Sequence, residues 1–208
     1  MKIIDISLPI EEGIVTYPGD AQFSKTAICT IERSGCNMTK LILGTHTGTH
    51  IDAPLHFLKD GDAIDQIPLS HFIGQAQVIE VDEQEINSTV IKKQLKDGIE
   101  RVLFKTRNSE LYKTKAFSKN YTYLTEDGAI FLTEAGIKLV GIDYISIERF
   151  GTPDFKVHKI LFQKNICILE GINLSAVAAG IYTLIALPLR LKGLDGSPVR
   201  AVLISESS

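Results

Sequence analysis

Three of the five histidines in this chain fall between residues 46 and 56, in the stretch HTGTHIDAPLHF. His46 and His50 precede Asp52, and imidazole together with carboxylate is a ligand set that suits zinc, manganese or iron. Ligand atoms lie about 2 Å from a shared ion, whereas a straight strand would separate His46 from His50 by roughly 13 Å. A helix is disfavoured because Thr-Gly-Thr at 47–49 forms helix poorly and Pro54 would interrupt the hydrogen bonds. We therefore predict a tightly coiled loop that brings the three side chains to one metal ion.

The predicted loop needs residues that tolerate a left-handed backbone, and Gly44 and Gly48 are placed to provide it. Three protein ligands leave one coordination position open, which is the arrangement of catalytic zinc, and no cysteine lies nearby in sequence to close a structural site. The competing interpretation is that these histidines only make hydrogen bonds or lie at the surface.

Two further histidines, His56 and His71, are interpreted separately. His56 follows Asp-Ala-Pro-Leu, where proline favours extended chain, so it need not join the same coordination sphere. An imidazole with an ordinary pKa of about 6.5 accepts and returns a proton at neutral pH, and His56 is therefore the candidate general base. His71, in IPLSHFIG, has no acidic or histidine neighbour in sequence and is interpreted as structural.

Composition argues against several classes of protein. The 208 residues carry a formal net charge of −3 with scattered lysines and arginines, so we expect no nucleic-acid binding. Three cysteines, none in a CxxC pair, favour reduced thiols in small core positions over a disulfide framework. The N-terminal MKIIDISLPIEEG lacks the apolar core of a secretory signal, and we expect a cytoplasmic protein.

One segment, 171–189, is uncharged and about long enough to span a bilayer. However, Asn173 is a favourable helix N-cap, Gly180 is a favourable helix stop, and a short apolar run then ends at Pro188. We therefore predict a buried helix, a turn and a buried strand there, with no membrane association.

The remaining apolar segments predict an α/β fold. Strands are expected at 3–6, 26–33, 39–43, 75–81, 101–105, 138–143, 166–169, 182–187 and 199–204, the last two joined as a hairpin by KGLDGSP. Helices are expected at 88–95, 126–135 and 153–163, the last opened by Thr152 and Pro153. Because helices and strands alternate after residue 75, we predict a single domain, 1–208, with a mixed sheet that is antiparallel in its N-terminal third. No disorder is expected before the terminal SESS.

The stretch HTGTHIDAPLHF resembles the signature HxGTHxDxPxH of the cyclase family of metal-dependent hydrolases and matches it at every fixed position. The similarity continues in YPGD at 17–20, in LVGIDYISIE at 139–148, in His158 followed by Glu170, and in LKGLDGSPVRAVL at 191–203. The best-known family members are kynurenine formamidases, and isatin hydrolases are relatives. The resemblance implies a swivelling β/β/α domain.

The resemblance also implies a set of metal ligands. His46, His50 and Asp52 would bind a first divalent ion, while His158 and Glu170 would help to hold a second, with Asp52 and Glu170 as bridges. The ion would be zinc, or alternatively manganese, with one or two ions in each chain.

Two further roles follow from the resemblance. His56 corresponds to the proton-transfer residue, and Tyr17 takes the place of a tryptophan that packs the aromatic substrate in kynurenine formamidases. This chain contains no tryptophan. We expect hydrolysis of a carbon–nitrogen bond in a small-molecule amide, in the manner of an arylformamidase that converts N-formylkynurenine to kynurenine and formate.

Three alternatives stay open at this point. The substrate could be a cyclic amide or lactam of the isatin type, or the chain could be a non-catalytic metal-binding protein on the same fold. Two histidines and one carboxylate also describe non-haem iron sites, so a metal-dependent lyase or oxygenase is the third. From the resemblance we expect a homodimer or homotetramer.

Overall fold

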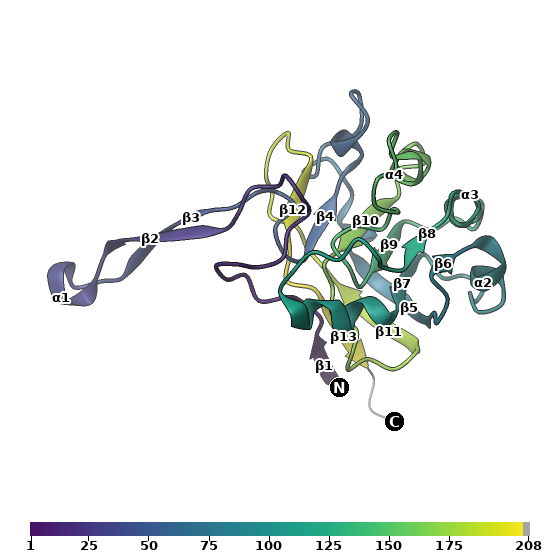
Figure 1. Ribbon diagram of the computed structural model, residues 1–208, viewed down its shortest axis with the longest axis horizontal. Helices are drawn as coiled ribbons and strands as arrows, with labels where there is room; N and C mark the ends of the chain where they lie inside the picture. The colour runs from purple at the N-terminus through teal and green to yellow at the C-terminus, as the bar shows by residue number, and fades with distance from the viewer. Residues whose placement is uncertain (206–208) are drawn as a thin grey trace.

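The computed structural model describes residues 1–205, so most of the terminal SESS lies outside the described residues. Within them, nine strands form one mixed sheet (Figure 1). In their order across the sheet the strands are β1 (Lys2–Asp5), β13 (Val202–Ser205), β11 (Gly180–Ile185), β5 (Ile73–Glu80), β7 (Arg101–Lys105), β9 (Leu139–Ile142), β10 (Cys167–Glu170), β4 (His50–Asp52) and β12 (Gly196–Pro198).

The centre of the sheet is parallel and its two ends are antiparallel. Strands β5, β7, β9 and β10 run parallel to one another. Strands β1, β13 and β11 extend one end antiparallel, and β4 and β12 extend the other. The predicted α/β class, a β/β/α fold with a mixed sheet, is confirmed.

Three short helices cover one face of the parallel strands (Figure 1). They are α2 (Ser88–Lys92), α3 (Glu126–Glu134) and α4 (Lys156–Phe162). The side chain of Asn87 caps α2 and that of Thr125 caps α3, because each accepts a hydrogen bond from an amide that has no partner within its helix.

The sheet separates two hydrophobic cores, and β7 contributes to both. Val102 and Phe104 belong to the core on the helix side, whereas Leu103 belongs to the core on the opposite face. This alternation follows from the two-residue period of side chains along a strand. A strand that is buried on both faces reads as a continuous apolar run, which is why these central strands were recognisable in the sequence.

The remaining elements lie outside the large sheet. They are the pair β2 (Ser24–Cys29) and β3 (Met38–Ile42) with helix α1 (Ile31–Ser34) between them, the pair β6 (Glu85–Ile86) and β8 (Tyr123–Leu124), and the 3₁₀ turns η1 (Pro54–His56), η2 (Leu69–His71) and η3 (Arg107–Thr114). None of the helices within residues 1–205 is long and apolar enough to cross a bilayer.

Two predicted helices differ in the structure. The helix expected from Pro153 begins only at Lys156, because Phe155 adopts a left-handed backbone with φ 48°, which a right-handed helix cannot include. The helix expected after Asn173 is absent from the described residues. The Asn173 side chain instead accepts hydrogen bonds from the amide and hydroxyl of Ser175, and such local bonds favour an isolated turn over a continuing helix.

Two further predictions about the chain need correction. The segment KGLDGSP does not form a simple hairpin between the last two long strands, because it leads into β12, which pairs with β4. Only Cys167 of the three cysteines is buried in the core; Cys36 is exposed and Cys29 is half-buried, with their sulfur atoms 3.5 Å apart.

Candidate metal centre

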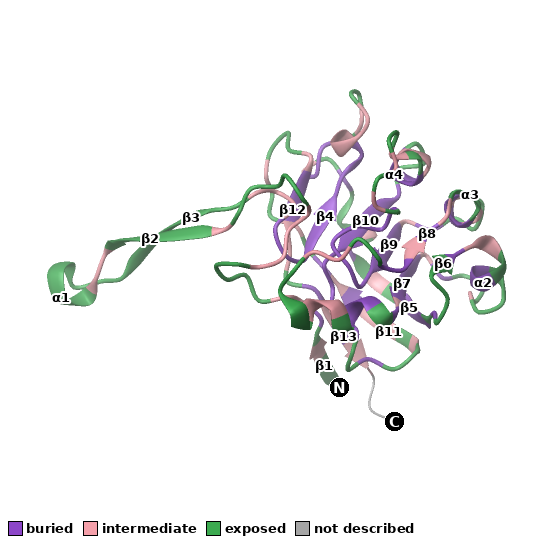
Figure 2. Ribbon diagram, viewed as in Figure 1, coloured by how far each residue is buried: buried purple, intermediate pink, exposed green. Residues whose placement is uncertain are grey.

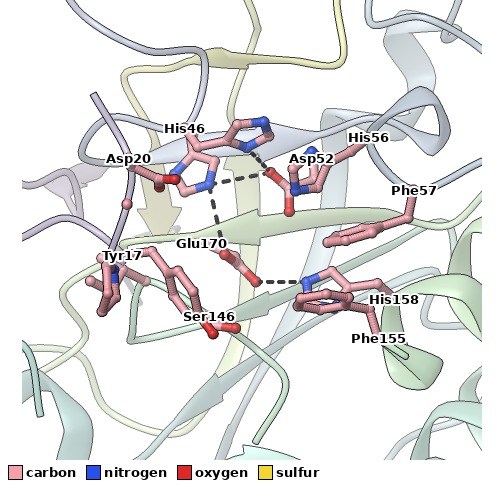
Figure 3. Close-up of a pocket in the computed structure, with 14 residues that line it drawn as sticks. Tyr17, Asp20, His46, Asp52, His56, Phe57, Ser146, Phe155, His158 and Glu170 are labelled. Carbon is pink, nitrogen blue, oxygen red and sulfur yellow. Dashed lines mark hydrogen bonds and ion pairs between the residues drawn. The ribbon is translucent and has the colours of Figure 1, made fainter. Parts of the chain in front are cut away.

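A cavity of about 380 Å³ opens at the end of the sheet where β4 and β10 lie side by side. Figure 3 shows Asp52 and Glu170 near its centre, with Phe57, Phe155 and His158 on one side and Tyr17 and Asp20 on the other. The cavity is lined by Tyr17, Pro18, Gly19, Asp20, His46, His50, Asp52, His56, Phe57, Ile145, Ser146, Phe155, His158 and Glu170.

The register of β4 and β10 assembles the inner part of this cavity. His50 lies directly opposite Glu170, and Asp52 lies on the same face of β4, whereas Ile51 between them packs into the core. His50 Nε2 lies 3.2 Å from Asp52 Oδ1 and 3.7 Å from Glu170 Oε2. All three polar side chains are buried.

A tight turn at 44–49 places the His46 side chain beside Asp52 in the same cavity. Gly48 has the predicted positive φ, 68°, whereas Gly44 does not, so that half of the prediction is wrong. The turn leaves His46 Nδ1 only 2.6 Å from Asp52 Oδ1. The coiled loop therefore brings both His46 and His50 to Asp52, as expected, while the binding of one metal ion by all three stays a prediction.

The turn packs against the corner that follows β10. Gly171 has φ 68°, and a Cβ atom there would lie 2.2 Å from the carbonyl oxygen of Gly48. Thr49 Oγ1 donates to the Gly171 carbonyl and accepts from the Leu8 amide. The threonine between the two histidines thus has a structural function, since it ties the turn to the strand that carries Glu170.

His158 lies in the first turn of α4, not in the middle of the helix as predicted. The Glu148 carboxylate accepts from the backbone amides of Val157 and His158 and lies 2.6 Å from His158 Nδ1. His158 Nε2 then faces Glu170 Oε1 at 3.5 Å. Glu148 therefore caps the helix and directs the other nitrogen of His158 into the cavity.

Asp195 is a site residue that the sequence reasoning missed. Its carboxylate lies 2.8 Å from His46 Nε2 and 3.5 Å from His56 Nδ1. The residue directly precedes β12, whose pairing with β4 places it beside Asp52. Asp195 and Glu148 both occur in segments that carried the family resemblance, LKGLDGSPVRAVL and LVGIDYISIE, but nothing in the sequence alone connects them to the histidines.

His56 lies closer to the predicted ligands than expected. A ring nitrogen of His56 and ligand atoms of His46 and Asp52 all lie within 4.8 Å of one another, and the rings of His56 and His46 have centroids 4.0 Å apart. The 3₁₀ turn η1 after Pro54 folds the chain back, whereas extended chain had been expected. His71 lies on η2 and does not line the cavity, in agreement with a structural role.

Aromatic side chains form the walls of the cavity. Phe57 and Phe155 stack with centroids 4.6 Å apart, next to His158. On the opposite side, Tyr17 packs against Phe117 at 5.4 Å. Burial and the neighbouring carboxylates raise the pKa of the Tyr17 hydroxyl, so this group stays protonated and able to donate a hydrogen bond.

Carboxylates control the protonation of two of the histidines. Burial opposes a charge on His46, but Asp52 and Asp195 outweigh it and raise its pKa to about 10. Burial likewise opposes a charge on His158, and its contacts with Glu148 and Glu170 raise its pKa to about 9. For His56 burial dominates, and its pKa is lowered.

The donor set fits a divalent cation. Asp52 and Glu170 are buried, and within residues 1–205 neither forms an ion pair with a lysine or arginine; imidazoles are the basic groups against them. Buried carboxylates need a compensating positive charge. Protonated His46 and His158 supply it here, and a divalent cation would supply it when these imidazoles act as neutral ligands. Two overlapping groups have ligand atoms within 4.8 Å of one another, namely His46, Asp52 and His56, and His50, Asp52 and Glu170. Asp52 belongs to both groups, as a bridging ligand would.

Comparison with known proteins gives consistent results. The model of the Cyclase family matches residues 4–149. A kynurenine formamidase of Bacillus anthracis is 42% identical over 204 residues, which cover 97% of each chain. The solved structure of a potential metal-dependent hydrolase with cyclase activity is 34% identical, with a TM-score of 0.86 over 100% of this chain and 99% of that chain. Isatin hydrolase A from Labrenzia aggregata, bound to benzyl benzoate, is 23% identical and shares the fold, with a TM-score of 0.86 over 99% and 94% of the two chains. The family match and the full-length similarity confirm the resemblance seen in the sequence: the chain belongs to the Cyclase family.

Proposed function

We propose that this protein is a metal-dependent hydrolase of carbon–nitrogen bonds in amides, with N-formylkynurenine or a related aryl formamide as substrate. The observation that carries the proposal is the meeting of two buried carboxylates, Asp52 and Glu170, with histidines at the base of an aromatic-walled cavity. Full-length similarity to kynurenine formamidases supports the choice of substrate.

His46, His50 and Asp52 would hold one ion and His158 and Glu170 would help to hold a second, as the resemblance implies. The groups whose ligand atoms lie within 4.8 Å of one another divide differently, into His46, Asp52 and His56, and His50, Asp52 and Glu170. A divalent ion supplies Lewis acidity, which lowers the pKa of water from about 15.7 towards 7 and polarises a carbonyl group. Nitrogen and oxygen ligands suit zinc, our first choice, and manganese as the alternative.

His56 is proposed to transfer the proton. Its Nδ1 faces Asp195, which leaves Nε2 as the atom that exchanges a proton with the substrate. Because burial lowers its pKa, the imidazole is neutral at pH 7 and can accept a proton from the attacking water. It then returns the proton to the leaving nitrogen, which would otherwise depart as an unstable anion.

The walls of the cavity suit an aryl group. The faces of Phe57 and Phe155 can stack on an aromatic ring, while the Tyr17 hydroxyl on the opposite side can donate to a polar substituent. Because Phe57 and Phe155 line the same cavity as Asp52 and Glu170, a ring stacked on them would present its attached amide to the ligand cluster.

The proposal is tested with protein reconstituted separately with zinc, manganese and cobalt. N-formylkynurenine and simple aryl formamides should release formate, and isatin tests the cyclic-amide alternative. Hydrolysis without oxygen consumption would reject an oxygenase. No turnover of any of these amides with any of the three metals would contradict the proposal.

Two variants test the metal assignment itself. The double variant His50→Ala, Asp52→Ala should lose metal and activity together, as measured by elemental analysis and formate release. His71→Ala is the matched control, because this histidine lies outside the cavity and its replacement should leave the metal content unchanged. Full metal content in the double variant would refute the ligand assignment.

Cytoplasmic localisation and a homodimeric or homotetrameric state remain predictions that we carry forward from the sequence. Light scattering tests the second of these, and a mass of 22.9 kDa at micromolar concentration would contradict it.

A further inference from the structure

Strands β2 and β3 and the intervening α1 form a hairpin, residues 24–42, that lies outside the large sheet (Figure 1). The hairpin is exposed over nearly its whole length (Figure 2). It carries two of the three cysteines, Cys29 and Cys36, whereas Cys167 is buried in the core. Neither hairpin cysteine lines the cavity of the candidate metal centre, so their position needs an explanation of its own.

The fold of the hairpin tip brings the two sulfur atoms together. Cys29 ends β2, and Cys36 lies two residues before the start of β3. Gly35 adopts a left-handed backbone with φ 75° and donates its amide to the Ile31 carbonyl, which ends α1 and turns the chain back. The Asn37 side chain accepts from the Ile31 amide and holds the returning chain against the tip. As a result the sulfur atoms of Cys29 and Cys36 lie 3.5 Å apart, within hydrogen-bond reach of each other.

Two thiols in contact can take part in binding a metal ion or can be oxidised. Within residues 1–205, no cluster of three or more potential metal ligands includes either cysteine. A disulfide bond needs only the two sulfur atoms, about 2 Å apart. From 3.5 Å that length is reached by a movement of about 1.5 Å, which side-chain rotation supplies. The geometry of the tip therefore favours oxidation over metal binding.

The hairpin is accessible to a small-molecule oxidant and attracts one that is negatively charged. Cys36 is exposed. The hairpin has a formal charge of +2, from three positive residues against one negative residue, namely Lys25, Arg33 and Lys40 against Glu32. Because the whole chain carries −3, this positive charge is local. A local excess of positive charge raises the concentration of anions around it, and oxidised glutathione is an anionic disulfide.

We propose that Cys29 and Cys36 form a redox-active dithiol, which small-molecule disulfides such as oxidised glutathione convert reversibly to an intramolecular disulfide. In a reducing compartment such a pair remains as thiols, and intracellular disulfides are typically transient and respond to oxidants. The expectation of reduced thiols from the sequence therefore applies to reducing conditions. The oxidation does not depend on the proposed hydrolysis, so its test needs no amide substrate.

The two cysteines have different functions in the exchange. The exposed Cys36 attacks first: its thiolate breaks the sulfur–sulfur bond of oxidised glutathione, forms a mixed disulfide, and releases one glutathione, which takes up a proton. The hydrogen bond with Cys36 raises the pKa of Cys29, so Cys29 keeps its proton until the second step. Cys29 then loses that proton and attacks the Cys36 sulfur, which releases the second glutathione. The two cysteines lose two electrons, and one glutathione disulfide is reduced to two glutathiones.

The disulfide would close a covalent loop, 29–36, around α1. An isolated two-stranded hairpin is at best marginally stable in water, and β2 and β3 pair only with each other within the described chain. Closing a loop of this length restricts the open conformations of the tip. Hydrogen exchange of the tip amides should therefore slow by roughly 10- to 100-fold on oxidation.

Peptide mapping of the full chain tests the disulfide directly. The protein is equilibrated with glutathione disulfide alone or with glutathione alone, alkylated, and digested with trypsin, which cleaves after Lys25, Arg33 and Lys40. The oxidised sample should contain peptides 26–33 and 34–40 joined to each other, and dithiothreitol should separate them. Cys167 is the internal control, because it is buried and should be recovered as a free thiol in both samples.

Two single variants test the order of the steps. Cys29→Ser should accumulate glutathione on Cys36, because the second attack cannot occur. Cys36→Ser should react with glutathione disulfide at least about tenfold more slowly than Cys29→Ser, because the remaining thiol is half-buried. Both substitutions lie in an exposed segment, and circular dichroism verifies that each variant is folded.

Several results would overturn the proposal. The first is recovery of peptides 26–33 and 34–40 as separate alkylated species after treatment with glutathione disulfide. The second is a link between cysteines of different chains, which mixing isotope-labelled with unlabelled protein detects. A Cys29→Ser variant without bound glutathione would refute the order of attack, and equal hydrogen exchange in the oxidised and reduced protein would refute the restriction of the tip.

Discussion

Replacing His56 by alanine distinguishes two functions that its position allows, namely proton transfer and metal binding. The residue was expected to transfer protons from outside the ligand set, yet one of its ring nitrogens lies within 4.8 Å of ligand atoms of His46 and Asp52. A metal ligand and a proton-transfer residue both abolish activity when they are removed. Only the ligand also lowers the metal content.

The size of the effect can be estimated from the surroundings of the ring. Positioned general acid–base groups contribute roughly 10²- to 10⁴-fold in rate, which corresponds to about 2.7 to 5.5 kcal/mol of activation free energy. The His56 side chain is 26% exposed, and its ring contacts His46 and Phe57 with centroids 4.0 and 4.2 Å apart. Loss of such partly exposed contacts typically costs about 1 kcal/mol, which is small beside the roughly 5–15 kcal/mol that stabilises a domain. A rate effect in His56→Ala would therefore report on the chemistry and not on unfolding.

The assay combines elemental analysis of dialysed protein with kcat and KM for an aryl formamide. We expect unchanged metal content, a kcat reduced by at least about a hundredfold, and partial recovery when imidazole is added to the solution. His71→Ala again serves as the control. A variant that retains near-normal turnover would remove His56 from the mechanism, whereas a variant that loses metal would place it among the ligands.

Four other substitutions test separate parts of the structure. Asp195→Asn should lower metal affinity or kcat by roughly 10- to 100-fold, because carboxylates that orient metal-binding histidines have effects of this size; chelator competition and kinetics measure both, and unchanged values would exclude a positioning role. Tyr17→Trp should raise kcat/KM for N-formylkynurenine by about tenfold if the side chain packs against the aryl ring, and no gain would argue against that contact. Burial raises the pKa of Asp143 from 3.8 to about 6, so the folded state retains a proton that the unfolded chain releases, and this group's contribution to stability falls as the pH rises from about 4 to 6. Asp143→Asn should remove this dependence. The gap between the unfolding free energies of the wild type and the variant should therefore change by up to roughly 3 kcal/mol between pH 4 and pH 6.5, and a gap of the same size at both pH values in chemical denaturation would contradict this. Gly171→Ala should destabilise the fold by more than about 2 kcal/mol, because its Cβ would lie 2.2 Å from the Gly48 carbonyl oxygen; chemical denaturation measures this, and a neutral substitution would show that the turn can move.

The local half of the site was predictable because its geometry depends on neighbouring residues. Spacing alone excluded a straight strand for His46 and His50, and glycine at position 48 permits the turn that the structure contains. The central strands were also predictable, since burial on both faces requires continuous apolar sequence. These features depend on backbone sterics and on side-chain period, both of which can be read within a short window.

The distant half of the site depends on the register between strands, which no short window contains. Glu170 meets His50 because β10 pairs with β4, and Asp195 meets His46 because β12 pairs with the other edge of β4. The late start of α4 likewise depends on a residue that lies outside the helix. Glu148 supplies the cap from outside the helix, so Thr152 and Pro153, although favourable for a helix start, are not used.

The segment 24–42, which contains β2, α1 and β3, was predictable in its secondary structure but not in its exposure to solvent. Its strands were expected from their composition, but their exposure was not, because β-forming residues such as Ile28 and Leu41 normally indicate a buried face. Within residues 1–205 these side chains have no packing partner, because β2 and β3 pair only with each other. The ligand turn that begins at Gly44 connects β3 to β4 of the large sheet, so the position of His46 depends on the register of that sheet at one end and on the pairing of β3 with β2 at the other.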